Sequence, residues 1–416
     1  MSVVEQERRK EHKRGSERPH KLMMAVQVVV AAIATIFAVV ISNHSFIDLD
    51  VYRAASKAML SGHGLYDSLA DAPFDLKYIY PPFAAVILVP VTFLPLGLLH
   101  VLWTVATVGL VFCTLYVVMN RLGISSAELT PLALLAPTLL LEPIRGTLGF
   151  GQVNMVIVTL VVLDCTGVIP RRFRGVGIGI AAAIKVTPLA FGLLLLVRKD
   201  YPSIVRAGGA FLLAAGVGAI FAPGDSNLFW TDVFFDTSRG GKPWYGPNQA
   251  ITGMVTRLGV TGTAGTLVWI VGVAAIVAAA AYAAWYFTRA GEHIAAFSVV
   301  ALASLLAAPF AASHHWSYVV VLLPLLVAPQ YRSWRYPLAL ATVVFVLGAQ
   351  WSLPGGGDRE LHQWSLAQQI VGDGECLAGI MLLVAAVVAA RGRKRAQTLK
   401  VTRIDVPERP AVPVQV

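Results

Sequence analysis

Apolar stretches of about 20 residues, each long enough to cross the hydrocarbon core of a bilayer, recur along most of this chain. A soluble core of this size would instead be built from short amphipathic elements, each with one polar face. Charged residues make up only 13% of the 416 residues, about half of the roughly 25% that soluble domains carry. The sequence therefore predicts an all-α membrane protein that crosses the bilayer about ten or more times.

The net charge of +10 does not indicate nucleic-acid binding, because the basic residues lie in short clusters between apolar stretches. Such clusters are typical of cytoplasmic loops. The first apolar run, 22–42, follows a basic tail and precedes no small-residue cleavage site, so we expect an uncleaved anchor. The predicted units are a cytoplasmic basic tail at 1–21, a membrane domain at 22–390 and a cytoplasmic tail at 391–416.

Alternation of the basic clusters predicts that residues 43–81 lie outside. The segment 82–96 is too short for an ordinary span and contains two prolines, so we expect it to start and end on the outer side. The segment 175–197 has basic residues at both ends and is predicted to form a broken hairpin around Lys185 that returns to the cytoplasmic side. The other spans are expected at about 99–120, 131–146, 153–168, 206–222, 266–288, 294–312, 317–330, 336–352 and 376–390.

This topology places every polar motif of note in an outer segment, so the chemistry is expected on the outer face. The motifs are Asp48-Leu49-Asp50, Tyr78-Ile79-Tyr80-Pro81-Pro82, Glu142-Pro143-Ile144-Arg145, Gly151-Gln152-Val153-Asn154, Asn248-Gln249 and Ser313-His314-His315-Trp316. The three cysteines have no paired spacing, which indicates neither a disulfide framework nor a zinc site.

The two early aspartates, Asp48 and Asp50, are candidates for a general base. A carboxylate that is partly removed from water has a raised pKa and holds a hydroxyl proton more strongly. Alternatively, either residue is only a first-turn acid of a helix. The D-x-D spacing could also hold a divalent cation, but no further acidic cluster supports a metal. Chemistry alone does not separate the two residues.

Histidines and a lysine supply the other candidates for chemistry. His314 and His315 could donate to a developing phosphate charge or orient a sugar hydroxyl, or they could be a pair of interfacial polar residues beside an aromatic-belt tryptophan. Lys185, within apolar sequence, could neutralise a lipid phosphate, reach the interface or pair with Asp164. Glu142 and Arg145 could pair across one helical turn.

Glycine and aromatic residues add two weaker signals. The stretch Gly149-Phe150-Gly151-Gln152 predicts a tight turn that either approaches a ligand or only joins two helices. In the predicted outer loop 223–265, Trp230, Trp244 and Tyr245 could stack on sugar rings or anchor the chain at the membrane interface.

Taken in order, the motifs resemble those of a known family. They are Asp48-Leu49-Asp50-Val51-Tyr52 after the first span, Tyr80-Pro81-Pro82-Phe83, Gly151-Gln152-Val153-Asn154, Lys185-Val186-Thr187-Pro188, Asn248-Gln249 and Ser313-His314-His315-Trp316. Over about 22–390 the chain resembles glycosyltransferases of the GT-C class, and more narrowly family 87, the actinobacterial α-mannosyltransferases that build phosphatidylinositol mannosides. In length and spacing it is similar to members that add the fifth mannose. The run Ala308–Ser313 departs from the Ser-Pro-x-Ser-Trp-like sequence expected there.

The resemblance implies a GT-C architecture with about 10–12 transmembrane helices and short juxtamembrane helices on the outer face. It implies inverting transfer of mannose from polyprenyl-phosphate-mannose to a mannosyl glycolipid, in α-1,2 linkage, at the outer face of the plasma membrane. Asp48 would be the base, with Asp50 the other candidate. His314 and Lys185 would stabilise the phosphate, while His315, Asn154 and Gln249 would orient sugars. The remaining substrate-binding candidates are Tyr52, Tyr80, Arg145, Gln152, Asn248 and Trp316. A lipid phosphate leaves without a nucleotide, so neither a metal nor another cofactor is required.

Two other functions remain open from the sequence. An arabinofuranosyltransferase of the same class would use polyprenyl-phosphate-arabinose, and assays with both donors would distinguish it. A lipid or glycolipid transporter would place polar groups near the bilayer midplane and often carry internal repeats. We find no convincing repeat, and most of the polar motifs lie at the predicted outer edge. The expected partners are therefore the lipid-linked sugar donor, a glycolipid acceptor and membrane lipids, with no nucleic acid.

Overall fold

The computed structural model describes residues 23–41, 45–124, 130–353 and 364–404. The predicted tail 1–21 lies outside the described residues, as does the end of the C-terminal tail from residue 405. Within the described residues the regular structure is helical apart from one isolated β-bridge, between Asn248 and Ala312. The prediction of an all-α protein is confirmed.

Five helices are long and apolar enough to cross a membrane: Met23–Ile41, α4 (Leu96–Arg121), α10 (Tyr201–Phe221), α13 (Gly262–Arg289) and the Gly374–Arg391 part of α18 (Gly374–Ile404). The 26 residues of α4 reach about 39 Å at the usual helical rise, which exceeds the hydrocarbon thickness of about 30 Å. Leucine and valine side chains on their outer faces are exposed, as a lipid-facing surface requires.

Several predicted spans consist of shorter helices because prolines and glycines interrupt the apolar sequence. The predicted span 131–146 is divided between α5 (Pro131–Leu139) and α6 (Glu142–Phe150), and the predicted span 317–330 begins within a 3-10 stretch, η7 (Ser313–Val321), that continues as α15 (Leu322–Val327). Other short elements are α7 (Asn154–Cys165), α14 (His293–Leu306) and α16 (Arg335–Leu347).

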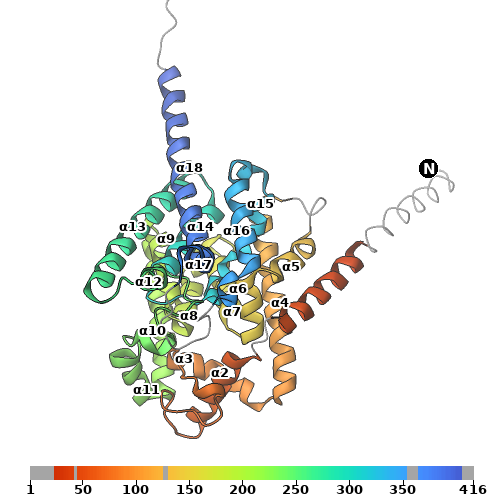
Figure 1. The fold of residues 1–416 in the computed structure, drawn as a ribbon, viewed down its shortest axis with the longest axis vertical. Coiled ribbons are helices and arrows are strands. Elements are labelled where there is room, and N and C mark those ends of the chain that lie inside the picture. Colours follow the sequence, from red (N-terminus) through yellow and green to blue (C-terminus); the bar gives the residue numbers. More distant parts are fainter. Residues whose placement is uncertain (1–22, 42–44, 125–129, 354–363, 405–416) are drawn as a thin grey trace, which may run out of the picture.

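Two short helices gather at one end of the bundle, here called the α2 end (Figure 1). They are α2 (Ile47–Leu60) and α3 (Pro82–Ile87), with α11 (Pro223–Leu228) beside them, while the last helix, α18, projects from the opposite end. After α3 the chain forms the 3-10 turn η2 (Val89–Phe93), and Arg53 of α2 donates to the Leu94 carbonyl oxygen at 3.2 Å. Both α3 and η2 therefore pack against α2, which is the arrangement expected of a segment that starts and ends on one side.

The predicted broken hairpin at 175–197 is present. Helix α8 (Val176–Ile184) ends at Lys185, whose backbone is extended, and the chain returns through η4 (Thr187–Phe191) and α9 (Gly192–Val197). A Cβ atom added at Gly175 would lie 2.1 Å from the Ser203 carbonyl oxygen, and the Arg198 guanidinium donates to the Cys165 carbonyl oxygen at 2.7 Å. Both ends of the hairpin therefore lie together, away from Lys185 at its tip.

Asp164 does not pair with Lys185, which was one of the open alternatives. Its carboxylate accepts hydrogen bonds from the backbone N–H groups of Gly175 and Ile178 at 2.7 and 3.0 Å. These groups belong to the first turn of α8, where unpaired amides and the helix dipole favour a negative charge. Asp164 therefore holds the base of the hairpin, and Lys185 is left for other partners.

Candidate active site

A cavity at the α2 end brings together residues from six separate parts of the chain. It has a volume of about 810 Å³, including its open mouth. We call it the Asp48 cavity; its polar lining includes Asp48, Tyr52, Tyr80, Gln152, His314 and His315. Tyr245 and Trp351 complete its aromatic wall.

Asp48 is placed by close packing between α2 and the turn that joins α6 to α7. Gly151 ends α6 with φ at +68°, and a Cβ atom there would lie only 2.6 Å from the Cβ atom of Leu49. The backbone N–H of Phe46 also donates to the Gly149 carbonyl oxygen at 2.8 Å. The stretch 149–152 is thus a turn between two helices whose glycine allows α2 to pack against it.

Gln152 fixes the carboxylate of Asp48. The Gln152 side-chain oxygen accepts hydrogen bonds from the Tyr52 and Tyr80 hydroxyls, at 2.8 and 3.2 Å. Its amide nitrogen must therefore face the other way, where it lies 2.7 Å from Asp48 Oδ2 and 3.3 Å from His314 Nε2. The two phenols thus determine the orientation of the amide, and the amide holds both the carboxylate and the imidazole.

Burial raises the pKa of Asp48 to about 6, although the hydrogen bond from Gln152 and the charge of Lys185 both oppose the shift. The carboxylate is still ionised at neutral pH, but it holds a proton more strongly than an ordinary aspartate does. Such a group suits the removal of a proton from a hydroxyl near pH 7.

Asp50 faces a different direction from Asp48. Its Oδ1 atom lies 3.1 Å from Nε2 of His100 on α4, and the ring of Phe46 stacks on His100 with centroids 4.2 Å apart. Asp50 does not line the Asp48 cavity. The structure thus separates the two aspartates, and of the two only Asp48 lines the Asp48 cavity.

A smaller cavity of about 390 Å³ adjoins the first and has the character of an anion site. We call it the Lys185 cavity; it is lined by Lys185, Asn154, Thr187, Ser304 and His315, among others. Lys185 Nζ donates to Asn154 Oδ1 at 3.2 Å and lies 5.5 Å from the centroid of the Tyr80 ring. His315 lines both cavities. An ammonium group, an imidazole and hydroxyls can together hold a phosphate.

Asn154 also braces the histidine segment. Its amide nitrogen donates to the His314 carbonyl oxygen at 2.8 Å. The hydroxyl of Thr147, on α6, lies 3.2 Å from the same carbonyl oxygen. The backbone at His314 is therefore fixed from both α6 and α7, and this fixes how the two histidines face the cavities.

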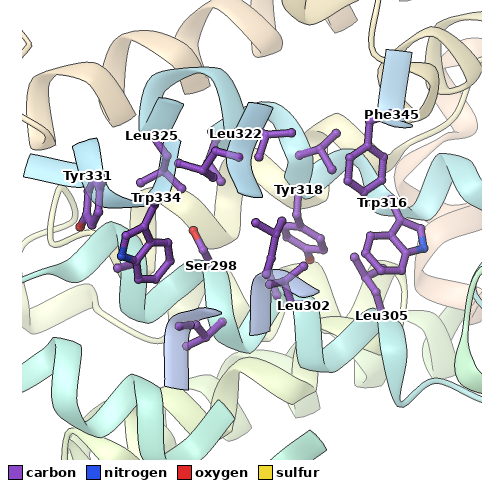
Figure 2. A pocket seen from close by; sticks show the side chains of 18 residues that line it. Ser298, Leu302, Leu305, Trp316, Tyr318, Leu322, Leu325, Tyr331, Trp334 and Phe345 are labelled. Atoms are coloured by element: carbon purple, nitrogen blue, oxygen red, sulfur yellow. The ribbon is translucent and has the colours of Figure 1, made fainter. Parts of the chain in front are cut away.

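Besides Asp50, four of the predicted site residues line neither cavity. Asn248 and Gln249 are fully buried: Asn248 accepts from the backbone N–H of Ala311 at 3.0 Å, and Gln249 donates to the Gly372 carbonyl oxygen at 2.8 Å. Trp316 lies in an apolar cavity between α14, α16 and α18, beside Phe345 at a ring distance of 5.7 Å (Figure 2). The fourth residue, Arg145, donates to backbone carbonyl oxygens.

Glu142 does not have Arg145 as its hydrogen-bond partner, in contrast to the simple reading of their spacing. Glu142 Oε1 accepts from the Ser313 hydroxyl at 2.9 Å and from the Trp351 indole at 2.5 Å. Trp351 lines the Asp48 cavity and was not identified from the sequence, where no motif surrounds it. Glu142 therefore acts on the cavity indirectly, because it holds one aromatic wall residue and the start of the histidine segment.

Metal binding was left open by the Asp48-Leu49-Asp50 spacing. Among the described residues, no group of three or more histidines, cysteines, aspartates or glutamates lies together as a metal site would require. The two aspartates face different surroundings, so the D-x-D spacing does not form one ligand set.

Comparison with known proteins adds sequence evidence to this geometry. A model of glycosyltransferase family 87 matches residues 78–309. The polyprenol-phosphate-mannose-dependent alpha-(1-2)-phosphatidylinositol mannoside mannosyltransferase of Mycolicibacterium smegmatis is 33% identical over 316 residues, 70% of each chain. The same-named protein of Mycobacterium tuberculosis is 33% identical over 329 residues, 74% of this chain and 76% of that protein.

A related group of proteins matches less closely. The polyprenol-phosphate-mannose-dependent alpha-(1-2)-phosphatidylinositol pentamannoside mannosyltransferase of Mycolicibacterium smegmatis is 29% identical over 306 residues, 72% of this chain and 74% of that protein. No solved structure matches the chain significantly. The region matched by the family model, 78–309, contains the ordered motifs from Tyr80 to Gln249. The Asp48–Tyr52 and Ser313–Trp316 motifs lie outside it.

Proposed function

Since the chain belongs to glycosyltransferase family 87 and is an α-mannosyltransferase, we propose that it transfers mannose from polyprenyl-phosphate-mannose to a phosphatidylinositol mannoside in α-1,2 linkage. The active site would be the Asp48 cavity, on the outer face of the plasma membrane. The observation that carries this proposal is the carboxylate of Asp48, which lines an open cavity and is held by Gln152 at 2.7 Å. The names of the relatives supply the donor and the class of acceptor.

In the proposed reaction, Asp48 takes the proton from an acceptor hydroxyl as that oxygen attacks the anomeric carbon of the donor mannose. The bond from this carbon to the lipid phosphate breaks, and the phosphate leaves with the bonding electrons. A β-linked donor and an α-linked product require a single inverting displacement. Gln152 contributes because it keeps one carboxylate oxygen hydrogen bonded and so fixes the direction of the other.

The leaving phosphate is best accommodated in the Lys185 cavity. Lys185 would neutralise its charge, and His315 would reach it from the boundary between the two cavities. His314, bonded through Gln152 to the same network as Asp48, is better placed to orient a sugar hydroxyl. The family resemblance implied that His314 stabilises the phosphate and His315 orients a sugar. The geometry favours the opposite assignment.

The proposed base predicts how the rate depends on pH. Only ionised Asp48 can accept the proton, and its pKa is raised to about 6, so the ascending limb of kcat/KM should be centred at about pH 6. Initial rates of mannose transfer between about pH 4.5 and 8 would measure this limb. A rate that is already independent of pH from about 4.5 upward would indicate a base with the ordinary aspartate pKa of about 3.9, and would contradict a buried Asp48 carboxylate as the base.

Purified protein in lipid nanodiscs provides the test of the proposed function. It should transfer labelled mannose from polyprenyl-phosphate-mannose to a phosphatidylinositol mannoside, and linkage analysis should find a new α-1,2 bond. Polyprenyl-phosphate-arabinose serves as the competing donor. The proposal would be contradicted if the protein transferred arabinose in preference to mannose. It would also be contradicted if the protein released no mannose from the donor, either to the acceptor or to water.

A further inference from the structure

A second open cavity is separated from the Asp48 cavity by a single segment of chain. Its volume is about 950 Å³ including its mouth. It is formed by the loop before α12 (Ile251–Arg257), by α12 itself and by the first turns of α13. We call it the threonine cavity, because five threonines line it: Thr237, Thr252, Thr256, Thr261 and Thr266.

The segment 237–247 separates the threonine cavity from the Asp48 cavity. Trp244 lines the threonine cavity, whereas the next residue, Tyr245, lines the Asp48 cavity. Likewise, Pro309 lines the threonine cavity, and the next residue, Phe310, lines the Asp48 cavity. The two cavities are therefore neighbours at the same end of the bundle, divided by little more than one layer of chain.

The lining of the threonine cavity suits a neutral, hydroxyl-rich ligand. No charged side chain is among its described lining residues, in contrast to the Lys185 cavity. Thr252 and Thr266 donate their hydroxyl protons to backbone carbonyl oxygens at 2.8 and 3.1 Å, which leaves their oxygens able to accept from ligand hydroxyls. Two indole rings, Trp244 and Trp269, supply flat apolar surfaces.

Trp244 adds an indole donor to the residues that line this cavity. Its indole nitrogen is buried, yet it has no hydrogen-bond acceptor in the described part of the chain. A buried N–H without an acceptor is costly, so such a group is expected to find a partner when the site is filled. The indole of Trp269, by comparison, already donates to the Ala307 carbonyl oxygen at 3.3 Å.

Sugar rings are recognised by hydroxyl acceptors, by aromatic faces and by N–H donors such as the Trp244 indole. We propose that the threonine cavity binds a hexopyranose unit of the acceptor glycan that does not itself react. This inference rests on the proposed function, since it assumes an acceptor with several sugars whose reactive end lies in the Asp48 cavity. The cavity then selects acceptors by the length of their glycan.

The test compares two acceptors with the full-length protein in nanodiscs. One is an alkyl α-mannoside with a single sugar, and the other is a phosphatidylinositol mannoside with a longer mannose chain. Trp244→Ala removes the ring and the donor, and should raise KM for the long acceptor about tenfold while kcat stays unchanged. Trp244→Phe keeps an aromatic ring and removes the N–H, and should raise the same KM about threefold. For the single-sugar acceptor, both KM and kcat should change less than about twofold in either variant.

A matched control is available on α13. Trp285 is 39% exposed near the opposite end of that helix, so Trp285→Ala should leave KM for both acceptors unchanged. Equal changes for both acceptors after Trp244→Ala, or no change for either, would overturn the glycan site. Should Trp244→Ala fail to accumulate in membranes, Thr256→Val removes one lining hydroxyl with almost no change in shape and must raise KM for the long acceptor alone.

Two further arms separate the alternatives. A deacylated acceptor with the same glycan should respond to Trp244→Ala as the lipid does; a response only with acyl chains present would assign the cavity to lipid and overturn the proposal. Asp48→Asn should abolish transfer to both acceptors. If the unaltered protein transfers mannose to neither acceptor, the proposed function fails, and that outcome is distinct from a failure of the glycan site.

Discussion

Replacing Asp48 with asparagine is expected to lower kcat about a thousandfold, because an amide has nearly the same shape as the carboxylate but cannot take up the acceptor proton. General acid–base groups typically contribute between about 100-fold and 10,000-fold to an enzymatic rate. The amide oxygen of the new side chain can still accept the hydrogen bond from Gln152, so the protein should fold and bind its substrates normally. The measurement is single-turnover transfer of labelled mannose at saturating acceptor.

Asp50→Asn is the matched control for this prediction. Asp50 lies two residues further along α2 and bonds to His100 instead of lining the Asp48 cavity. We expect its replacement to change kcat by less than about threefold, as for a partly exposed ion pair. A large loss for Asp50→Asn together with a small loss for Asp48→Asn would reverse the assignment of the base.

Replacing Lys185 with methionine is expected to lower kcat about 100-fold. The side chain keeps its length and packing but loses the positive charge that would stabilise the departing phosphate. Removal of one preorganised donor from a site where charge develops commonly costs about 100-fold to 1,000-fold. Stopped assays with polyprenyl-phosphate-mannose would measure the effect, which should fall mainly on kcat because the charge on the phosphate increases as the bond breaks.

Lys57→Met controls for the loss of a positive charge at the α2 end. Lys57 lies on α2 and pairs with Asp71 at 2.9 Å, with both side chains well exposed to solvent. Exposed pairs of this kind contribute little, so we expect less than a twofold change in rate. If Lys185→Met behaved like Lys57→Met, the Lys185 cavity would not be the phosphate site.

The membrane fold and the family follow from features that the sequence displays directly. Hydrophobic length and the spacing of basic clusters predicted an all-α membrane protein and the broken hairpin at Lys185, and both are confirmed. The family inferred from the ordered motifs is confirmed by the match over residues 78–309 and by relatives at 33% identity. Each of these features is either a property of a short stretch of sequence or the order of such stretches along the chain. Neither depends on how the helices pack.

The division of spans into short helices was not predicted. Hydropathy averages over about 19 residues, so it does not detect a break such as that between α5 and α6 at Leu140 and Leu141. Helix α6 is the more polar side, since it contains Glu142 and Arg145, but one averaging window covers both sides of the break. The break nevertheless matters, because it sets the direction of α6 and so the position of Gly151 and Gln152 against α2.

Helical periodicity predicts that the two aspartates lie on different faces of a helix, but not which face lines the cavity. Residues two apart on a helix project about 200° apart, so a helix over this segment implies that Asp48 and Asp50 face opposite sides. Which side faces the cavity depends on the packing of Leu49 against Gly151, and that contact joins residues about a hundred positions apart. Chemistry alone therefore left both residues open.

Buried polar residues were the hardest to interpret from the sequence. A loop residue that braces backbone has the same composition as one that binds a ligand. Asn248 and Gln249 thus looked like binding residues, but in the structure their side chains hydrogen bond to backbone around Ala311 and Gly372. Trp351 shows the converse: it lines the Asp48 cavity, yet no neighbouring motif marks it.

Helix α10 gives two parts of the active site a common mechanical support. Near its start it packs so closely on α8 that a Cβ atom at Gly179 would lie 2.3 Å from the Ala207 carbonyl oxygen. Near its end, a Cβ atom at Gly218 would lie 2.7 Å from the backbone nitrogen of Phe83, three residues after Tyr80. Any movement of α10 would therefore reach both the helix that ends at Lys185 and the segment that carries Tyr80.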